Sequence, residues 1–334
     1  MLLAKSKLPD DYIDASIGEA HVVRDALLSI FDVSAIDLPK DKGIFEYQEP
    51  QGYKPLVQLL EAKHQAPVII VNGAKQGLGA ICYALKQLGK SNLALPRPWW
   101  CLIPPLMEMH GVNHIIEDDL NTDSYLCVAP NNPCGNMPDM KTLSESMKER
   151  GLPLIHDGAY YSHTYLPQSY KLDSFGDAQI YSISKLFGIS SIRLGYVVCG
   201  NTELYKLILH YVEAMTVGVS IVSQIFLYNL LNTMHGYPTL TEKFEHLSYS
   251  AIRENKLLIK QVSSNVLEVP NNIEDANGMF LWCKTGPKAD FEKAKVNIIS
   301  GEHFGMPGFI RMNLALPENQ IREIVRRLNQ NACC

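Results

Sequence analysis

The chain has 334 residues, of which 46% are hydrophobic and 19% are charged, and its formal net charge is −5. This length can build a well-packed core and two domains, and the acidic balance argues against nucleic acid as the main partner. No apolar run is long enough for a membrane helix, and the opening MLLAKSKLPDDY is too short for a signal peptide. The eight cysteines have no C-x-x-C spacing, which favours reduced thiols in a cytoplasmic protein over disulfides or zinc.

Short apolar runs alternate with amphipathic stretches through the middle of the chain. Strands are predicted at 66–73, 91–96, 112–117, 124–130, 152–157, 177–184 and 194–200, and helices at 75–89, 100–109 and 140–151. Because continuous apolar strands alternate with helices, the pattern predicts an α/β fold with a mostly parallel sheet covered on both faces.

The last third of the chain has a different pattern. Residues 202–265 are almost entirely helical in pattern, strands are predicted at 278–284, 296–300 and 308–316, and PENQIREIVRRL closes as a helix. This order predicts a large domain over residues 45–220 and a smaller α+β domain built from residues 1–44 and 221–334. The N-terminal segment has weak periodicity, and we expect it to pack against the small domain. The final Cys333-Cys334 pair has no role in this scheme.

Polar residues stand where several of the central strands end. The first strand leads into NGAK (72–75), where glycine lets backbone N–H groups at a helix N-terminus approach an anion. Later strands end at the turn NNPCG (131–135), at Asp157 with Tyr160 behind it, and at Lys185. In an open α/β sheet, ligands bind at these strand ends. Each residue alone has a commoner role as a helix cap, a tight turn or a surface ion pair, but together they predict one site.

The segment YSISKLFGISSIRLGYVV (181–198) predicts a strand, a loop and a strand, with Lys185 and Arg193 in apolar surroundings. Desolvation and a nearby cation lower the pKa of a lysine, which can then attack a carbonyl as an amine and form a Schiff base. A buried carboxylate facing a pyridine nitrogen would keep that ring protonated. The backbone amides of residues 73–75, Ser182 and Arg193 would bind a phosphate. These requirements match pyridoxal 5′-phosphate (PLP).

Ordered motifs along most of the chain resemble those of the fold-type I PLP-dependent aminotransferases of class I/II, the aspartate aminotransferase-like superfamily. SISKLFGISSIRLGY resembles the lysine motif, VAPNNPCG the Asn-Pro-x-Gly turn, HDGAY the Asp-x-x-Tyr element, VNGAKQGL the phosphate loop and RPWWCLIPP the ring-stacking segment. The resemblance implies a large PLP-binding domain with a seven-stranded, mostly parallel sheet between helices. It also implies the cofactor contacts: Lys185 as the Schiff-base lysine, Asp157 on the pyridine nitrogen, Asn132 and Tyr160 on the ring hydroxyl, Trp100 rather than Trp99 on the ring face, and Gly73, Ala74, Lys75, Ser182 and Arg193 around the phosphate.

Three further motifs concern the substrate and a second subunit. GFIRMNLALP resembles the strand whose arginine holds the substrate α-carboxylate, which implies Arg311 with Asn132 beside it. SIGEAH resembles the N-terminal glycine segment and places Gly18 near the substrate. YQEPQGYKPL resembles Tyr-x4-Gly, whose tyrosine reaches the phosphate of the other subunit, so Tyr47 is expected to cross the interface of a homodimer with shared active sites.

The resemblance implies PLP-dependent transfer of an amino group between an amino acid and a 2-keto acid, with Lys185 as the proton-transferring base. A carbon–sulfur β-lyase, a decarboxylase of an amino acid or its phosphate ester, and a non-catalytic binding protein with this fold are the alternatives. Nucleotide binding is disfavoured because no G-x-G-x-x-G or Walker-type motif follows a strand. A metal site is not expected, since Gly111 breaks the helix that His110 and His114 would need.

Overall fold

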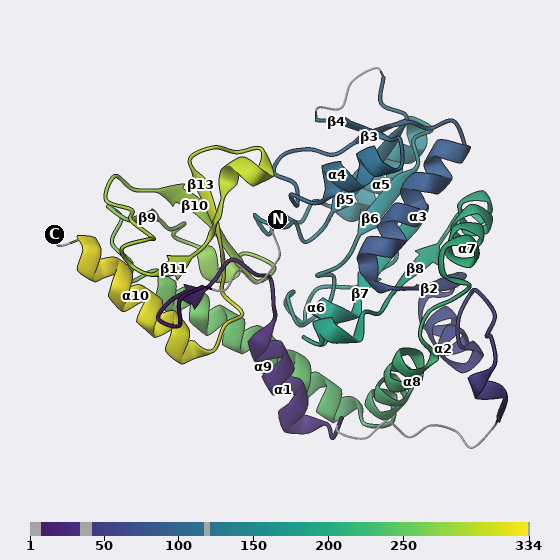
Figure 1. Ribbon diagram of the computed structural model, residues 1–334, viewed down its shortest axis with the longest axis horizontal. Coiled ribbons are helices and arrows are strands. Elements are labelled where there is room, and N and C mark those ends of the chain that lie inside the picture. The colour runs from purple at the N-terminus through teal and green to yellow at the C-terminus, as the bar shows by residue number, and fades with distance from the viewer. Residues whose placement is uncertain (1–7, 34–41, 117–120, 333–334) are drawn as a thin grey trace.

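The computed structural model describes residues 8–33, 42–116 and 121–332 of the chain (Figure 1). The Cys333-Cys334 pair lies outside these residues. The described chain contains a seven-stranded, a four-stranded and a two-stranded sheet. The order in the seven-stranded sheet is β2-β8-β7-β6-β5-β3-β4. Its strands are β2 (Val68–Val71), β3 (Asn92–Ala94), β4 (Asn113–Ile115), β5 (Ser124–Val128), β6 (Leu154–Asp157), β7 (Ala178–Ser182) and β8 (Gly195–Cys199).

The seven-stranded sheet is parallel except at β8, which runs antiparallel to both β2 and β7. The other neighbours, from β7 across to β4, pair in parallel. The predicted α/β fold with a mostly parallel, seven-stranded sheet is therefore confirmed. Because β8 is reversed, its amino end lies at the edge where β2, β6 and β7 have their carboxyl ends. Arg193, just before β8, thus reaches the same edge as Asp157 and Lys185.

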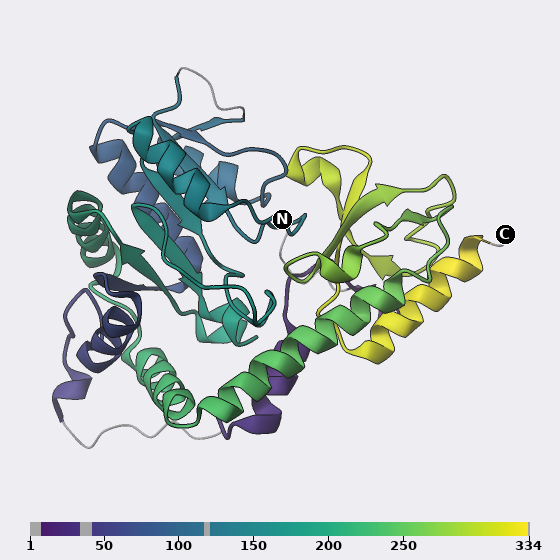
Figure 2. The same ribbon diagram turned by 180° about the vertical axis from the view of Figure 1, so that it is seen from behind.

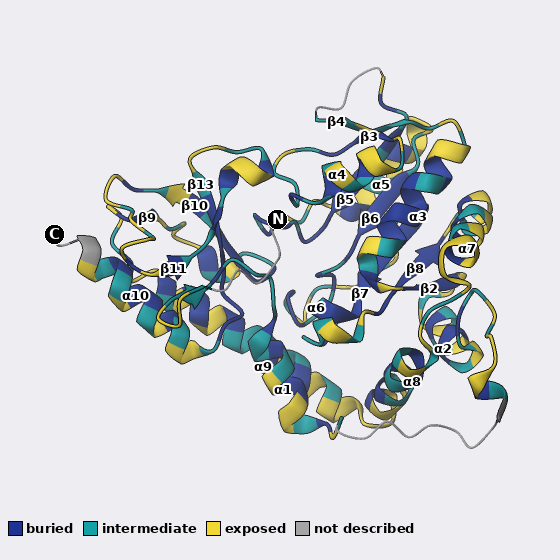
Figure 3. Cartoon of the chain, in the orientation of Figure 1, coloured by how far each residue is buried: buried dark blue, intermediate teal, exposed yellow. Residues whose placement is uncertain are grey.

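Helices cover both faces of this sheet, because successive residues of a strand point to opposite sides. Ile69 and Val71 pack in one core with α3 (Gly73–Gln87), α4 (Ile103–Met109) and α7 (Thr202–Thr216). Val68 and Ile70 pack in another with α2 (Lys54–His64) and α8 (Ile221–Gly236). Helix α5 (Met140–Glu149) adds a small core with Leu154 on that second side. Most residues of these strands are accordingly buried, except in the edge strand β4, whereas the helices are buried along one stripe (Figure 3).

The second half of the molecule is built on an antiparallel sheet with the order β12-β13-β10-β9. Its strands are β9 (Leu267–Glu268), β10 (Phe280–Thr285), β12 (Ile299–Ser300) and β13 (Phe309–Asn313), packed against α9 (Pro238–Ile259) and α10 (Glu318–Ala332). Figure 2 shows α9 running from one half of the molecule to the other, with α10 beside it. The N-terminal segment joins this half: β1 (Ile13–Asp14) pairs with β11 (Val296–Asn297), and α1 (His21–Ile30) packs on α9. The domain boundaries at 45 and 220 stay a prediction.

The structure departs from the predicted elements in three places. The connection between β7 and β8 is not a simple loop: it holds the one-turn helix α6 (Ile183–Leu186) and the 3-10 turn η2 (Ser190–Ile192). The helical stretch 202–265 is broken at Val217 and Gly218, which have positive φ, and ends at Ile259. Helices α1 and α2 were not predicted, because neither starts with a side-chain cap or an acidic first turn. The remaining 3-10 turns are η1 (Lys42–Phe45), η3 (Ile273–Asp275) and η4 (Gly301–Phe304).

Candidate active site

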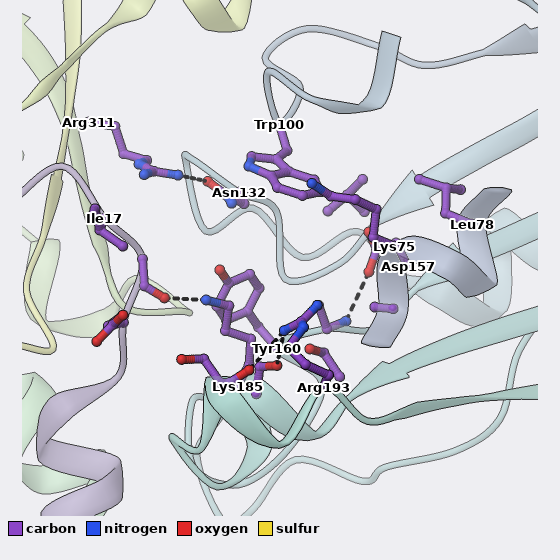
Figure 4. Close-up of a pocket in the computed structure, with 18 of the residues that line it drawn as sticks. Ile17, Lys75, Leu78, Trp100, Asn132, Asp157, Tyr160, Lys185, Arg193 and Arg311 are labelled. Atoms are coloured by element: carbon purple, nitrogen blue, oxygen red, sulfur yellow. Dashed lines mark hydrogen bonds between the residues drawn. The ribbon is translucent and has the colours of Figure 1, made fainter. Parts of the chain in front are cut away.

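All the predicted site residues except Gly73 and Tyr47 line a cavity of about 390 Å³ between the two halves of the molecule (Figure 4). This volume lies in the range of small-molecule sites, roughly 300–1,000 Å³. Most of its side chains come from the edge of the seven-stranded sheet where β2, β6 and β7 end. Arg311 on β13 and the N-terminal residues 17–19 close the opposite side. The cavity thus joins segments from both ends of the chain.

One end of the cavity is suited to an anion. Helix α3 begins at Gly73 without a side-chain cap, so its first N–H groups face the cavity, where Ala74 and Lys75 line it. Arg193 lies against this turn, and its Nη1 donates to Ser190 O at 2.8 Å. Gly73 has a φ of +72°, and a Cβ there would lie 2.8 Å from the Arg193 Nη2. Only glycine therefore lets the backbone and the guanidinium converge on one ligand.

Lys185 lies on α6 at the floor of the cavity. Its Nζ donates a hydrogen bond to the backbone oxygen of Gly18. Burial is the main cause that lowers the pKa of this amine to about 8, and the positive charges of Arg311 and Arg193 contribute to that value, partly opposed by Glu19. The hydroxyl of Tyr165 donates to the Lys185 backbone oxygen at 2.6 Å and fixes the turn that carries the amine. The site thus holds a lysine that loses its proton easily.

Asp157 ends β6 and is 8% exposed. Burial raises the pKa of its carboxyl to about 6, although the Ala159 N–H donates to it at 3.1 Å. Among the described residues, no cation pairs with Asp157. A positively charged ligand group would therefore be stabilised here. Tyr160 is also buried in the cavity wall, and burial raises the pKa of its phenol, so the hydroxyl stays protonated.

The remaining wall carries an aromatic face and a second cation. Trp100 lines the cavity with the Lys75 Nζ 5.3 Å from its ring centre, whereas Trp99 packs against His114 outside it. Arg311 is 2% exposed and lies between the rings of Phe280 and Phe304, with centroid distances of 4.3 and 5.2 Å. The Arg311 Nη1 donates to the Oδ1 of Asn132 at 3.0 Å, as Figure 4 shows, and its Nη2 donates to Ser16 O at 2.5 Å. A ligand carboxylate could take the place of both acceptors.

The residues present fit PLP. The first turn of α3 beside Arg193 suits its phosphate, and the amine of Lys185 suits its aldehyde. The unpaired carboxyl of Asp157 suits its pyridine nitrogen, because a protonated ring would relieve the cost of burying that charge. These groups occupy separate walls of one cavity and leave Arg311 for a second ligand.

Two predicted residues have a different placement. Gly73 backs Arg193 without lining the cavity, and Tyr47 lies outside it with 91% of its surface exposed. The sequence reasoning missed several residues at the site: Ile17, Glu19, Ser184, Ser190, Ser191 and Tyr165. All of these except Tyr165 lie inside motifs quoted above: the three serines belong to the lysine motif, and Ile17 and Glu19 flank Gly18 in SIGEAH.

Within 8–33, 42–116 and 121–332, no three histidine, cysteine or acidic residues cluster as metal ligands would. Over the same part of the chain, no helix combines the length and the apolar character that crossing a membrane requires.

Comparisons with known proteins identify the family of the chain. A family model described as aminotransferase class I and II matches residues 18–328. The probable aspartate/prephenate aminotransferase of Aquifex aeolicus is 24% identical over 330 residues, which cover 86% of this chain and 81% of that protein. Tryptophan aminotransferase-related protein 2 of Arabidopsis thaliana is 26% identical over 296 residues, which cover 78% of this chain and 65% of that protein.

A solved structure has the same fold. Thermus thermophilus aspartate aminotransferase with maleate superposes with a TM-score of 0.77 at 18% identity, over 96% of this chain and 92% of that one. The family model spans both halves of the molecule, including the cavity residues from Gly18 to Arg311. The chain therefore belongs to the aminotransferase class I and II family, with an aspartate aminotransferase-like fold, and is a PLP-dependent transferase.

Proposed function

We propose that the cavity between the two halves carries out the amino transfer between an amino acid and a 2-keto acid, with Lys185 as its central residue. When bound, PLP supplies an aldehyde that links to amines and a protonated ring that withdraws electrons from the substrate Cα. The first turn of α3, Ser182 and Arg193 would hold its phosphate. Asp157 would hold the ring nitrogen, and Tyr160 and Asn132 the ring hydroxyl, with Trp100 against the ring face.

The substrate amino acid is proposed to dock by its carboxylate on Arg311. The guanidinium is fixed between Phe280 and Phe304 and already donates to two oxygen acceptors, Asn132 Oδ1 and Ser16 O. A carboxylate presents two oxygens in the same geometry and adds a negative charge, so it would displace at least one of these weaker acceptors. This docking orients the Cα–H bond toward Lys185.

The Lys185 amine is proposed to move the proton of the substrate Cα. A pKa of about 8 leaves an appreciable neutral fraction of this amine near pH 7, and its Nζ can then accept a proton. Tyr165 keeps the Lys185 backbone in place during the transfer. The burial that lowers the pKa of this amine also keeps water from competing for the proton.

One observation carries this proposal: a lysine of lowered pKa, an unpaired buried carboxyl and two arginines converge on one cavity. The chain offers a matched control, because Lys256 is also buried, has a pKa lowered to about 8 by burial, and donates to backbone oxygens. Lys256 does not line the cavity. The two lysines therefore share an amine pKa of about 8, and only Lys185 lines the cavity.

The test compares the Lys185→Ala and Lys256→Ala variants with the unchanged chain. Each is incubated with PLP, its visible absorption is recorded, and the product is reduced with borohydride for peptide mass spectrometry. We expect the unchanged chain and Lys256→Ala to carry the reduced cofactor on Lys185, and Lys185→Ala to carry none and to have no turnover. A Lys185→Ala variant with the absorption band or turnover of the unchanged chain would refute the role of this lysine.

A screen of products separates transamination from the other reactions of the fold. Amino acids are offered with 2-keto acids, and keto acid, pyruvate, ammonia and CO₂ are measured in parallel. Keto acid formed in proportion to the amino acid consumed supports the proposal. Pyruvate with ammonia would instead indicate a β-lyase, CO₂ a decarboxylase, and PLP binding without any product a non-catalytic protein.

We also propose a cytoplasmic homodimer in which Tyr47 reaches the phosphate site of the partner. The support is that Tyr47 is 91% exposed and does not line its own cavity, as expected of a side chain that acts in another subunit. The neighbouring Phe45 is exposed too, at 76%, so this stretch offers apolar surface to a partner. The proposed domains keep their boundaries, with residues 45–220 holding the cofactor and residues 1–44 and 221–334 holding Arg311.

A further inference from the structure

Residues 16–19, which we call the strap, cross the mouth of the cavity beside Arg311. Ile17, Gly18 and Glu19 line the cavity, and Figure 4 shows the strap beside Lys185, with a hydrogen bond joining the two. The fit is close at Gly18, where a Cβ would lie 3.1 Å from the Phe280 ring and 3.5 Å from the Lys185 Nζ. The strap is therefore a wall of the proposed active site that the chain supplies from its N-terminal end.

The backbone oxygens of the strap alternate between two sets of donors. Ser16 O accepts from the Arg311 Nη2, and Gly18 O accepts from the Lys185 Nζ. Ile17 O and Glu19 O accept from a different donor. The carbonyls of Ser16 and Gly18 thus accept hydrogen bonds from the two cations of the cavity. The carbonyls of Ile17 and Glu19 need another donor.

That partner is a single side chain, Asn313. Its Nδ2 donates to Ile17 O at 2.9 Å and to Glu19 O at 2.8 Å, while its Oδ1 accepts from the Ala315 N–H at 2.9 Å. Asn313 is 0% exposed and stands two residues after Arg311, so both side chains leave the same face of β13. Its backbone N–H also donates to Ala15 O at 2.8 Å. The contacts with Ala315 and Ala15 therefore fix the position of Asn313 independently of its hydrogen bonds to the strap.

We infer that Asn313 is a positioning residue for the proposed reaction. It fixes the register of the strap against β13, so that Gly18 O faces Lys185 and Ser16 O faces Arg311. If the strap shifted by one residue, Ile17 O and Glu19 O would take the places opposite Lys185 and Arg311. The side-chain amide of Asn313 would then lie opposite carbonyls other than its present two acceptors. With the strap fixed, a carboxylate can displace Ser16 O from Arg311 while the cover over the lysine stays in place. This inference rests on the proposed function of Lys185 and Arg311.

The test needs variants that release the strap without touching either cation. Asn313→Ala removes the amide, and Asn313→Asp keeps its shape and the acceptor for Ala315 while losing both donors. Asn255 provides a matched control, because it is 1% exposed and its Nδ2 also donates to two backbone oxygens, Leu314 O and Leu316 O, each at 2.8 Å. Asn255→Ala therefore removes the same kind of buried amide outside the strap.

The first measurement uses the cofactor-free protein and needs no substrate. Each variant is labelled at pH 10 with limiting acetic anhydride, and acetylation of Lys185 is measured relative to the exposed Lys171 by peptide mass spectrometry. At pH 10 an amine with a pKa of about 8 is neutral, so its labelling rate reports access. We expect about tenfold faster labelling of Lys185 in both Asn313 variants, and a rate within twofold of the unchanged chain in Asn255→Ala.

The second measurement uses the PLP-loaded enzyme and the amino donor found in the product screen. Release of the strap should raise KM more than it lowers kcat, and Asn255→Ala should change neither. Labelling of Lys185 at the unchanged rate in both Asn313 variants, or equally fast labelling in Asn255→Ala, would overturn the inference. The labelling is measured without PLP, so it tests the inference about the strap independently of the aminotransferase proposal. A wrong inference about the strap would appear in the labelling rates, and a wrong aminotransferase proposal would appear in the product screen.

Discussion

The phosphate cradle can be tested by adding one carbon atom. In Gly73→Ala, the new Cβ would lie 2.8 Å from the Arg193 Nη2, and the backbone would keep a φ of +72° that disfavours alanine. The φ alone costs roughly 1–2 kcal/mol of stability. Displacing Arg193 removes charged hydrogen bonds to the phosphate, worth about 1.5–3 kcal/mol, which weakens PLP binding roughly 10- to 100-fold.

Gly89→Ala separates the two effects. Gly89 has a φ of +75° and nothing within 4 Å of the Cβ position, so this variant carries the backbone strain without the collision. Urea unfolding of the cofactor-free proteins should show comparable losses of stability in both variants. Titration with PLP, followed by absorbance, should show weakened binding in Gly73→Ala alone. If Gly73→Ala binds PLP as tightly as Gly89→Ala, then Arg193 and the first turn of α3 do not form the phosphate site.

Other outcomes are expected from the buried groups. Burial raises the pKa of Asp157 from 3.8 to about 6 on folding. The cofactor-free chain should therefore lose about 3 kcal/mol of stability as the pH rises from about 4 to about 6. Asp157→Asn should remove this pH dependence of stability in urea unfolding. Tyr165→Phe leaves the Lys185 carbonyl without its donor at 2.6 Å and should cost about 1–3 kcal/mol in the same assay. Mixed dimers of Tyr47→Phe and Lys185→Ala should regain one intact PLP site per dimer, and the absence of any such site would place Tyr47 in its own subunit.

The side chains at the ends of strands could be predicted from the sequence. Asp157 stands at the end of one largely apolar run and Lys185 just past another, each run short enough to indicate a buried strand, and parallel strands bring their carboxyl ends to one edge. The placement of Arg193 was harder to predict from the apolar pattern. It depends on the reversed direction of β8, and a strand has the same apolar pattern whichever way it runs.

Contacts between distant parts of the chain could not be predicted from any local pattern. Asn313 holds carbonyls 296 and 294 residues away, and its amide carries no sign of that partner in the sequence. Tyr165 likewise sits in no motif and acts through a backbone oxygen. The role of Asn313 depends on how the N-terminal segment lies against β13, which tertiary packing decides.

The hydrogen bond between Arg311 and Asn132 spans 179 positions of the chain and links β13 to the turn that follows β5. In the proposed docking, a substrate carboxylate would compete with Asn132 for Arg311 and would replace this contact with one through the ligand. The strength of the contact between the two halves would then depend on how much substrate is bound. The hydrogen-exchange rates of the backbone amides of β13 would therefore change with the concentration of substrate.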